Sequence, residues 1–164
     1  KSVLSALVGI AIDRGLVRGP DASIAEALPR RLFASDADVA RFRHVTVRHV
    51  LGMSVLDAPD PPRVRTPEAL ARERQFWAVP NRVAFALTQP LLGRPGSEYQ
   101  YNDVTPMLAI GAVQYAIATT ALEFAEQSLF QPMGFRNYEW MHQDRSGLDL
   151  GGEGAWLRAR GRMK

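Results

Sequence analysis

Apolar residues at helical spacing dominate the pattern of this chain. Residues 2–13 are almost wholly apolar and lead to Gly15, a residue suited to the left-handed conformation that closes helices. A helix this apolar needs cover on most of its sides. We therefore expect it either at the centre of a helical bundle or between the bundle and another layer, and the second arrangement implies a sheet outside this sequence.

Polar residues that favour helix N-caps precede most of the other apolar segments. Ser23 with Glu26, and Thr120 with Glu123, also fit the capping box, in which the third helical residue bonds back to the cap. The predicted caps are Ser23, Thr46, Thr66, Asn81, Asp103 or Thr105, and Thr120. The pattern thus predicts a series of helices separated by turns.

The other segments contain no alternating run that requires a strand. Residues 33–42 are expected to form a polar connection, and residues 54–65, rich in proline and aspartate, a loop. A long helix is expected over residues 106–118, and a last helix is expected to begin near residue 156. The predicted fold is mainly α, with residues 1–164 forming a single helical domain or a fragment of one.

Composition excludes several function classes. The chain has 164 residues, 46% of them hydrophobic, which is enough for one domain with a core. It has no cysteine, which excludes disulfides, thiolate zinc sites and a cysteine nucleophile. His44, His49 and His142 lack metal-ligand spacing, so no metal is expected.

Charge and hydropathy limit the kinds of partner that we expect for this chain. The net charge of +3 comes from arginines spread along the chain, without a basic run interleaved with aromatic residues, so no nucleic-acid partner is expected. The apolar runs are shorter than the ~20 residues of a membrane-spanning helix, so no membrane span is expected. The first residue is not methionine and no signal region follows, so we expect a processed or trimmed end; periplasmic, extracellular and cytoplasmic locations stay open.

Two features carry candidate chemistry. Lys1 lies at the start of the apolar helix, where its charge is unfavourable unless something uses it. Residues 95–103, PGSEYQYND, bring Tyr101, Asn102 and Asp103 to a helix start. A serine hydroxyl needs a neighbouring base, which a desolvated lysine with a lowered pKa, or a tyrosinate beside a cation, can supply. The alternatives are a solvated terminal lysine and a simple turn with an N-cap.

Several segments, in this order and spacing, resemble the serine β-lactamase and penicillin-binding-protein superfamily. They are KSVLSALVGIAIDRG at residues 1–15, VTVRHVL at 45–51, PGSEYQYND at 95–103, LFQPMG at 129–134, and Trp140 with Asp144 and the glycines of residues 151–154. The resemblance covers nearly the whole chain. It is closest to the β-lactamase-related branch of class C enzymes, esterases and 6-aminohexanoate-type amide hydrolases.

The resemblance implies a helical domain packed on an antiparallel sheet, with the sheet absent from this chain. It implies that Lys1 is the lysine of a Ser-x-x-Lys motif whose serine stands three residues earlier, outside this sequence. Tyr101 is similar to the tyrosine of the Tyr-x-Asn motif, which relays a proton between nucleophile and leaving group. Lys1 and Tyr101 are therefore the candidate catalytic residues, and no metal or organic cofactor is implied.

The chain departs from the family pattern at Asp103, at residues 53–56, and in its last part. The family's Lys-Thr-Gly-like element, on a sheet strand whose backbone helps to form the oxyanion hole, is not supplied after Gly154. Asp103 stands where asparagine is usual, and an ionised carboxylate cannot donate the hydrogen bond that an amide gives. Residues 53–56, Met-Ser-Val-Leu, replace a Thr-Ser-Gly-Leu loop. The candidate substrate-binding residues are Asn102, Asp103, Ser54, Gly151 and Gly152, with the glycines shaping a wall of the cleft.

The resemblance implies a serine hydrolase that acts on a small-molecule ester or amide through an acyl-enzyme, with this chain lacking the serine and inactive alone. The alternative is a non-catalytic helical binding or scaffolding module derived from the same family. In either case, helices made to face a sheet leave apolar surface exposed, which favours self-association of the isolated chain.

Overall fold

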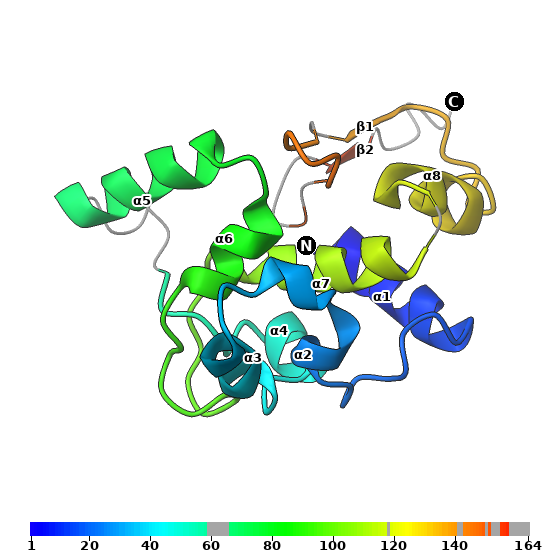
Figure 1. Cartoon of the computed structure of the whole chain (residues 1–164). Helices are drawn as coiled ribbons and strands as arrows, with labels where there is room; N and C mark the ends of the chain where they lie inside the picture. The colour runs from blue at the N-terminus through cyan, green and yellow to red at the C-terminus, as the bar shows by residue number, and fades with distance from the viewer. Residues whose placement is uncertain (59–65, 118, 141–142, 150, 152–154, 158–164) are drawn as a thin grey trace.

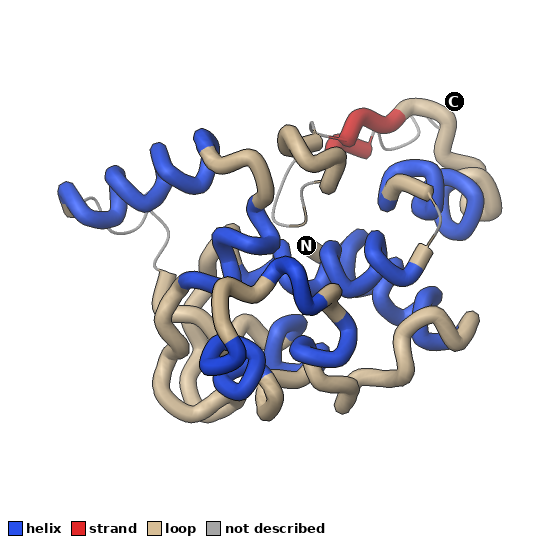
Figure 2. The backbone as a smooth tube through the Cα atoms, viewed as in Figure 1, coloured by secondary structure: helices blue, strands red, loops and turns tan. Residues whose placement is uncertain are grey.

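A computed structural model describes residues 1–58, 66–117, 119–140, 143–149, 151 and 155–157 of the chain. It is mainly helical, as predicted (Figures 1 and 2). The helices are α1 (Ser2–Asp13), α2 (Ile24–Ala27), α3 (Asp36–Phe42), α4 (Val47–Leu51), α5 (Pro67–Ala78), α6 (Arg82–Thr88), α7 (Thr105–Ala116) and α8 (Ala121–Ala125). A 3-10 turn, η1 (Arg30–Leu32), follows α2, and a π-helical turn, η2 (Glu126–Phe130), extends α8.

The predicted caps at four helix starts are confirmed. The side chains of Thr46, Thr66, Asn81 and Thr120 each accept a hydrogen bond from the backbone N–H three residues on. Thr120 and Glu123 close the predicted capping box. Ser23 also caps its helix, but through the N–H of Ala25. These bonds satisfy N–H groups that have no partner within the helix.

One predicted connection is wrong. Residues 36–42, expected to be part of a polar connection, form α3. The Ser35 side chain accepts a hydrogen bond from the N–H of Asp38 at 3.1 Å, and two aspartates in the first turn complement the helix dipole. Phe42, at the end of this helix, is fully buried, so its packing stabilises a helix too short to form alone.

Two short strands that the sequence pattern did not predict are also present. β1 (Tyr138–Trp140) pairs antiparallel with β2 (Ala155–Leu157), and Tyr138 lies opposite Leu157. The helix expected from residue 156 is therefore replaced by a strand as far as residue 157, and its remainder lies outside the described residues. Three-residue strands are too short to show an alternating pattern. Within the described part of the chain, this two-stranded ribbon is the sheet.

Helix α7 occupies the centre of the fold. It packs against α1, α2, α4, α6 and α8 (Figure 1), and every residue from Thr105 to Val113 is buried. Gly111 allows α6 and the end of α2 to approach closely, because a Cβ at this position would lie 2.9 Å from Val83 Cγ2 and 3.2 Å from Leu28 Cδ2. The central helix is thus α7 and not the first helix.

Helix α1 is covered on one side by α7 and η2. Leu4, Leu7, Val8 and Ala11 make its buried face. Its other face is a row of small residues that are exposed: Ser2, Ser5, Ala6 and Gly9. Among the described helices, none is long and apolar enough by itself to span a membrane; α7 with residues 121–130 reaches that length only as a pair bent by 82°.

Two helix glycines provide a matched test of this packing. Gly9→Ala adds a methyl group into open space, so better helix propensity should raise the free energy of unfolding by about 0.5–1 kcal/mol. Gly111→Ala gains the same propensity but crowds Val83 and Leu28, so a net loss of about 1–3 kcal/mol is expected. Urea unfolding of both variants measures the difference. Equal effects would show that α7 is not closely packed at Gly111.

Candidate active site

The Lys1 side chain joins the start of α1 to the loop that precedes α7. Its Nζ donates a hydrogen bond to the Tyr101 hydroxyl at 2.7 Å and forms a hydrogen-bonded ion pair with the Asp103 carboxylate. These partners lie about a hundred residues away along the chain. The structure therefore brings together the two residues that the sequence analysis assigned to catalysis, Lys1 and Tyr101, and adds Asp103 as the partner of the lysine.

The loop that carries Tyr101 is held by a second loop, residues 53–58. The N–H of Gly96 donates to Ser54 O at 2.9 Å, and the N–H of Gln100 donates to Met53 O at 3.0 Å. Gly96 has a φ of +86°, and a Cβ there would lie 3.0 Å from the His49 ring. The close approach of His49 therefore favours glycine in the first turn of PGSEYQYND.

Asn102 fixes the geometry of the residues on either side of it. It is buried, and its Oδ1 accepts the N–H of Thr105 at 2.6 Å at the start of α7. Its Nδ2 donates to Gln100 O at 3.0 Å and to Leu56 O at 3.5 Å. Since Tyr101 and Asp103 flank an inward-facing residue and are only partly buried, both reach Lys1 from the same side.

The predicted cap of α7 is thereby corrected. We expected the side chain of Asp103 or Thr105 to cap this helix, but the side chain of Asn102 binds its first N–H, that of Thr105. Asp103 instead forms the ion pair with Lys1. The polar atoms of the Asn102 side chain are hydrogen-bonded to backbone groups around it, so this residue holds the loop that carries the site.

The Lys1 ammonium is stabilised by its partners. Burial lowers the pKa of Lys1, but the hydrogen bonds to Asp103 and Tyr101, together with the charge of Asp103, raise it by more, so the pKa lies above its ordinary value. Lys1 is therefore a cation at neutral pH. The lowered lysine pKa that a lysine base would need is therefore not found in this arrangement. The assignment of the base to Lys1 or to Tyr101 stays a prediction.

The stability that this contact contributes depends on pH in a defined direction. Because the pKa of Lys1 is higher in the folded chain than in the unfolded chain, the contribution is complete below the unfolded pKa. It is lost as the pH rises through the folded pKa. The side chains of Lys1 and Asp103 are 19% and 26% exposed, so solvent screens their charges in part.

The other predicted site residues lie in the supporting structure. Ser54 is half-buried, and its Oγ donates to His49 O at 3.1 Å at the end of α4. Gly151 is buried against α7: its N–H faces Met107 Sδ at 3.5 Å, and a Cβ would lie 2.6 Å from Pro106 O. Gly152 lies outside the described residues.

Asp144, one of the residues that carry the family resemblance, organises a turn. Its carboxylate is buried and accepts the N–H groups of Ser146 and Leu148 and, at 2.8 Å, that of Arg82 at the start of α6. The Asp144 side chain thus ties the segment before Gly151 to the helical body. In the described ranges, no group of three or more histidine, aspartate or glutamate side chains is arranged to hold a metal ion.

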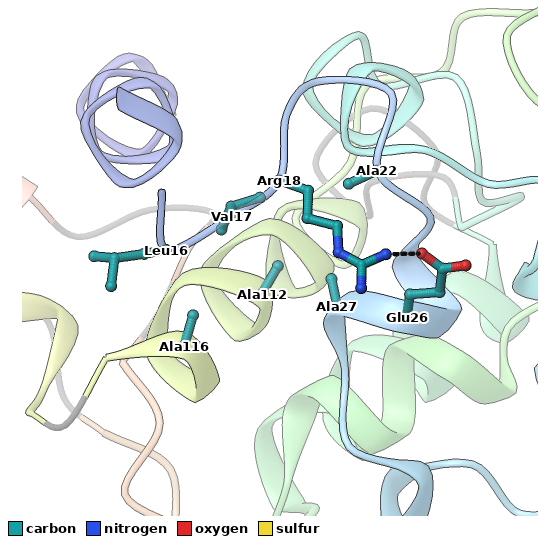
Figure 3. A pocket seen from close by; sticks show the side chains of 8 residues that line it. All are labelled: Leu16, Val17, Arg18, Ala22, Glu26, Ala27, Ala112 and Ala116. Atoms are coloured by element: carbon teal, nitrogen blue, oxygen red, sulfur yellow. Dashed lines mark hydrogen bonds and ion pairs between the residues drawn. The ribbon is translucent and has the colours of Figure 1, made fainter. Parts of the chain in front are cut away.

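A small hollow lies away from this cluster. It has a volume of about 160 Å³ and opens between the turn after α1, helix α2 and the second half of α7 (Figure 3). The residues that line it are Leu16, Val17, Arg18, Ala22, Glu26, Ala27, Ala112 and Ala116. Its one ion pair, Arg18 Nη1 to Glu26 Oε2 at 3.2 Å, is well exposed, so the hollow offers no buried polar group for chemistry.

Comparison with known families identifies the class of protein. A model of the Beta-lactamase family matches residues 1–147, most of the chain. This chain therefore belongs to the β-lactamase family, and its resemblance to the serine β-lactamase and penicillin-binding-protein superfamily is confirmed. The closer likeness to class C enzymes and esterases stays a prediction. No curated protein matches the chain.

Replacement of Asn102 tests whether it holds the loop. Asn102→Ala leaves the Thr105 N–H and two carbonyl groups without these bonds, so we expect the free energy of unfolding to fall by about 1–3 kcal/mol. Asn137→Ala, at an exposed position, is the matched control and should change it by less than about 0.5 kcal/mol. Urea unfolding measures both. Equal values would contradict the supporting role of Asn102.

Proposed function

We propose that this chain is the helical portion of a serine hydrolase that cleaves an ester or an amide through an acyl-enzyme. One observation carries the proposal: the Lys1 ammonium at the start of α1 donates to the Tyr101 hydroxyl at 2.7 Å. A phenolic oxygen held beside a fixed cation is a suitable base for an alcohol nucleophile, because the cation stabilises the phenolate. The family supports the hydrolase class.

The nucleophile in this proposal is a serine three residues before Lys1. Residues three apart on a helix share a face, so a helical turn continued before α1 places the hydroxyl on the side of Lys1 and Tyr101. The polypeptide that supplies this serine would precede residue 1. This chain then provides the base and the cation, and the serine lies next to them.

The proposed reaction proceeds in two halves. Tyr101, as phenolate, takes the serine proton while the serine oxygen attacks the carbonyl carbon of the substrate. The ester or amide bond then breaks, the leaving group receives the proton from Tyr101, and the acyl group stays on serine. Water repeats the sequence and releases the acid. Lys1 remains charged throughout, held by Asp103, and donates its hydrogen bond to the Tyr101 oxygen.

The proposed partners follow from the same arrangement. The substrate is a small-molecule ester or amide, and the chemistry needs no metal or organic cofactor, since base and cation come from side chains. The exposed row of small residues on α1 supports a close-packed covering layer, which in the family resemblance is the sheet. Without that layer, we expect the isolated chain to self-associate.

The role of Tyr101 is tested in a protein that carries the serine three residues before Lys1 together with the sheet. Tyr101→Phe removes the hydroxyl that binds Lys1, so turnover of an activated ester should fall by about 10²–10⁴-fold. Tyr99→Phe is the matched control: Tyr99 lies on the same loop, is 69% exposed, and its variant should keep full turnover. Steady-state hydrolysis measures both variants.

Labelling with a fluorophosphonate probe, read by intact mass, tests the nucleophile itself. Stoichiometric labelling of the extended protein, abolished when its serine is changed to alanine, is the expected result. Absence of labelling in a folded protein would contradict the hydrolase proposal and favour the non-catalytic binding or scaffolding module. Unchanged turnover in Tyr101→Phe would remove this residue from the mechanism.

A further inference from the structure

The Asp103 carboxylate is linked to the proposed base, Tyr101, through two hydrogen bonds that both come from Lys1. Lys1 Nζ contacts both the Tyr101 hydroxyl and Asp103 Oδ1, so the carboxylate and the hydroxyl share one donor. The Asp103 side chain is 26% exposed. Part of this side chain is thus open to solvent. In the proposed function, the substrate lies beside a nucleophile next to Tyr101, and so close to Asp103.

In the extended protein, where Lys1 has no free terminal amine, the charges of the Lys1 and Asp103 side chains cancel. The Lys1 ammonium and the Asp103 carboxylate form an ion pair, so the cluster has no net positive charge to attract an anionic substrate. The rest of residues 95–103 adds Glu98 and no cation. A carboxylate on the substrate would therefore meet a like charge here, whereas an ammonium or an N–H group would meet an acceptor.

Resting on the function proposed above, we propose that Asp103 selects the substrate by charge. The preferred substrates are esters or amides that carry a cationic or hydrogen-bond-donating group close to the scissile carbonyl. Those that carry a carboxylate at the same place are disfavoured. Asp103 also positions Lys1, but only its charge can discriminate between substrates of the same shape.

Three aryl esters of equal acyl length test this selection. Their acyl chains end in an ammonium, a neutral amide or a carboxylate group, and kcat/KM is measured for each in the extended, serine-bearing protein. We expect the ammonium ester to be preferred over the carboxylate ester by about tenfold or more at low salt, and the preference to shrink as ionic strength rises.

Asp103→Asn keeps the shape of the side chain and removes its charge. It should reduce the preference for the ammonium ester over the carboxylate ester by about tenfold, whatever it does to the absolute rates through Lys1. Glu98→Gln is the matched control, because Glu98 is an exposed carboxylate on the same loop. It should leave the preference within about twofold, since the charge of an exposed carboxylate is screened by solvent and salt.

The outcomes distinguish a failure of charge selection by Asp103 from a failure of the proposed serine hydrolase function. Hydrolysis of all three esters with an unchanged ratio in Asp103→Asn would overturn the charge selection while leaving the hydrolase intact. A ratio that changes equally in Glu98→Gln would also overturn it, because the effect would belong to the surface as a whole. Failure of the folded protein to hydrolyse any ester or to react with the fluorophosphonate probe would overturn both.

Discussion

The contact of Lys1 with Tyr101 and Asp103 is the interaction on which the candidate site depends. It connects the first residue of the chain, at the start of α1, to the loop that leads into the central helix α7. A buried ammonium without partners would lose its proton, whereas this one is held charged because its hydrogen bonds outweigh the effect of burial. The geometry of the site and the charge state of Lys1 are thus set by the same atoms. Both depend on the position of the loop at residues 95–103.

That loop is positioned by side chains that take no part in the proposed chemistry. Asn102 faces inwards and binds the N–H of Thr105 and the carbonyls of Leu56 and Gln100. Backbone bonds to residues 53–58 hold the other side of the loop, and the burial of α7 fixes the helix that follows. Because these bonds are made to backbone groups of the loops and of α7, the polar groups that hold Tyr101 and Asp103 in place do not compete with them for Lys1.

The elements of the fold were largely predictable, and the roles within the site were less so. Thr46, Thr66, Asn81 and Thr120 have strong cap preferences, and each caps the expected helix. The cap at Ser35 was not predicted, because the polar sequence after it concealed α3, which depends on the burial of Phe42. The roles of Asn102 and Asp103 could not be separated from sequence, since both residues suit a cap and only tertiary packing decides which one faces inwards. The strands were missed because three residues show no period.

A pH titration of the Lys1 side chain is the most direct test of this account. Lys1 and Lys164 are the lysines of the chain, so selective ¹³C labelling of lysine gives two side-chain signals by NMR, which Lys164→Arg assigns. With the N-terminal amine acetylated, the Lys1 signal of the folded chain should titrate at a higher pH than in the urea-unfolded chain. Asp103→Asn should move it back towards the unfolded value. A folded Lys1 that titrates at or below its unfolded pKa would contradict the ion pair and the role of Lys1 as a permanent cation.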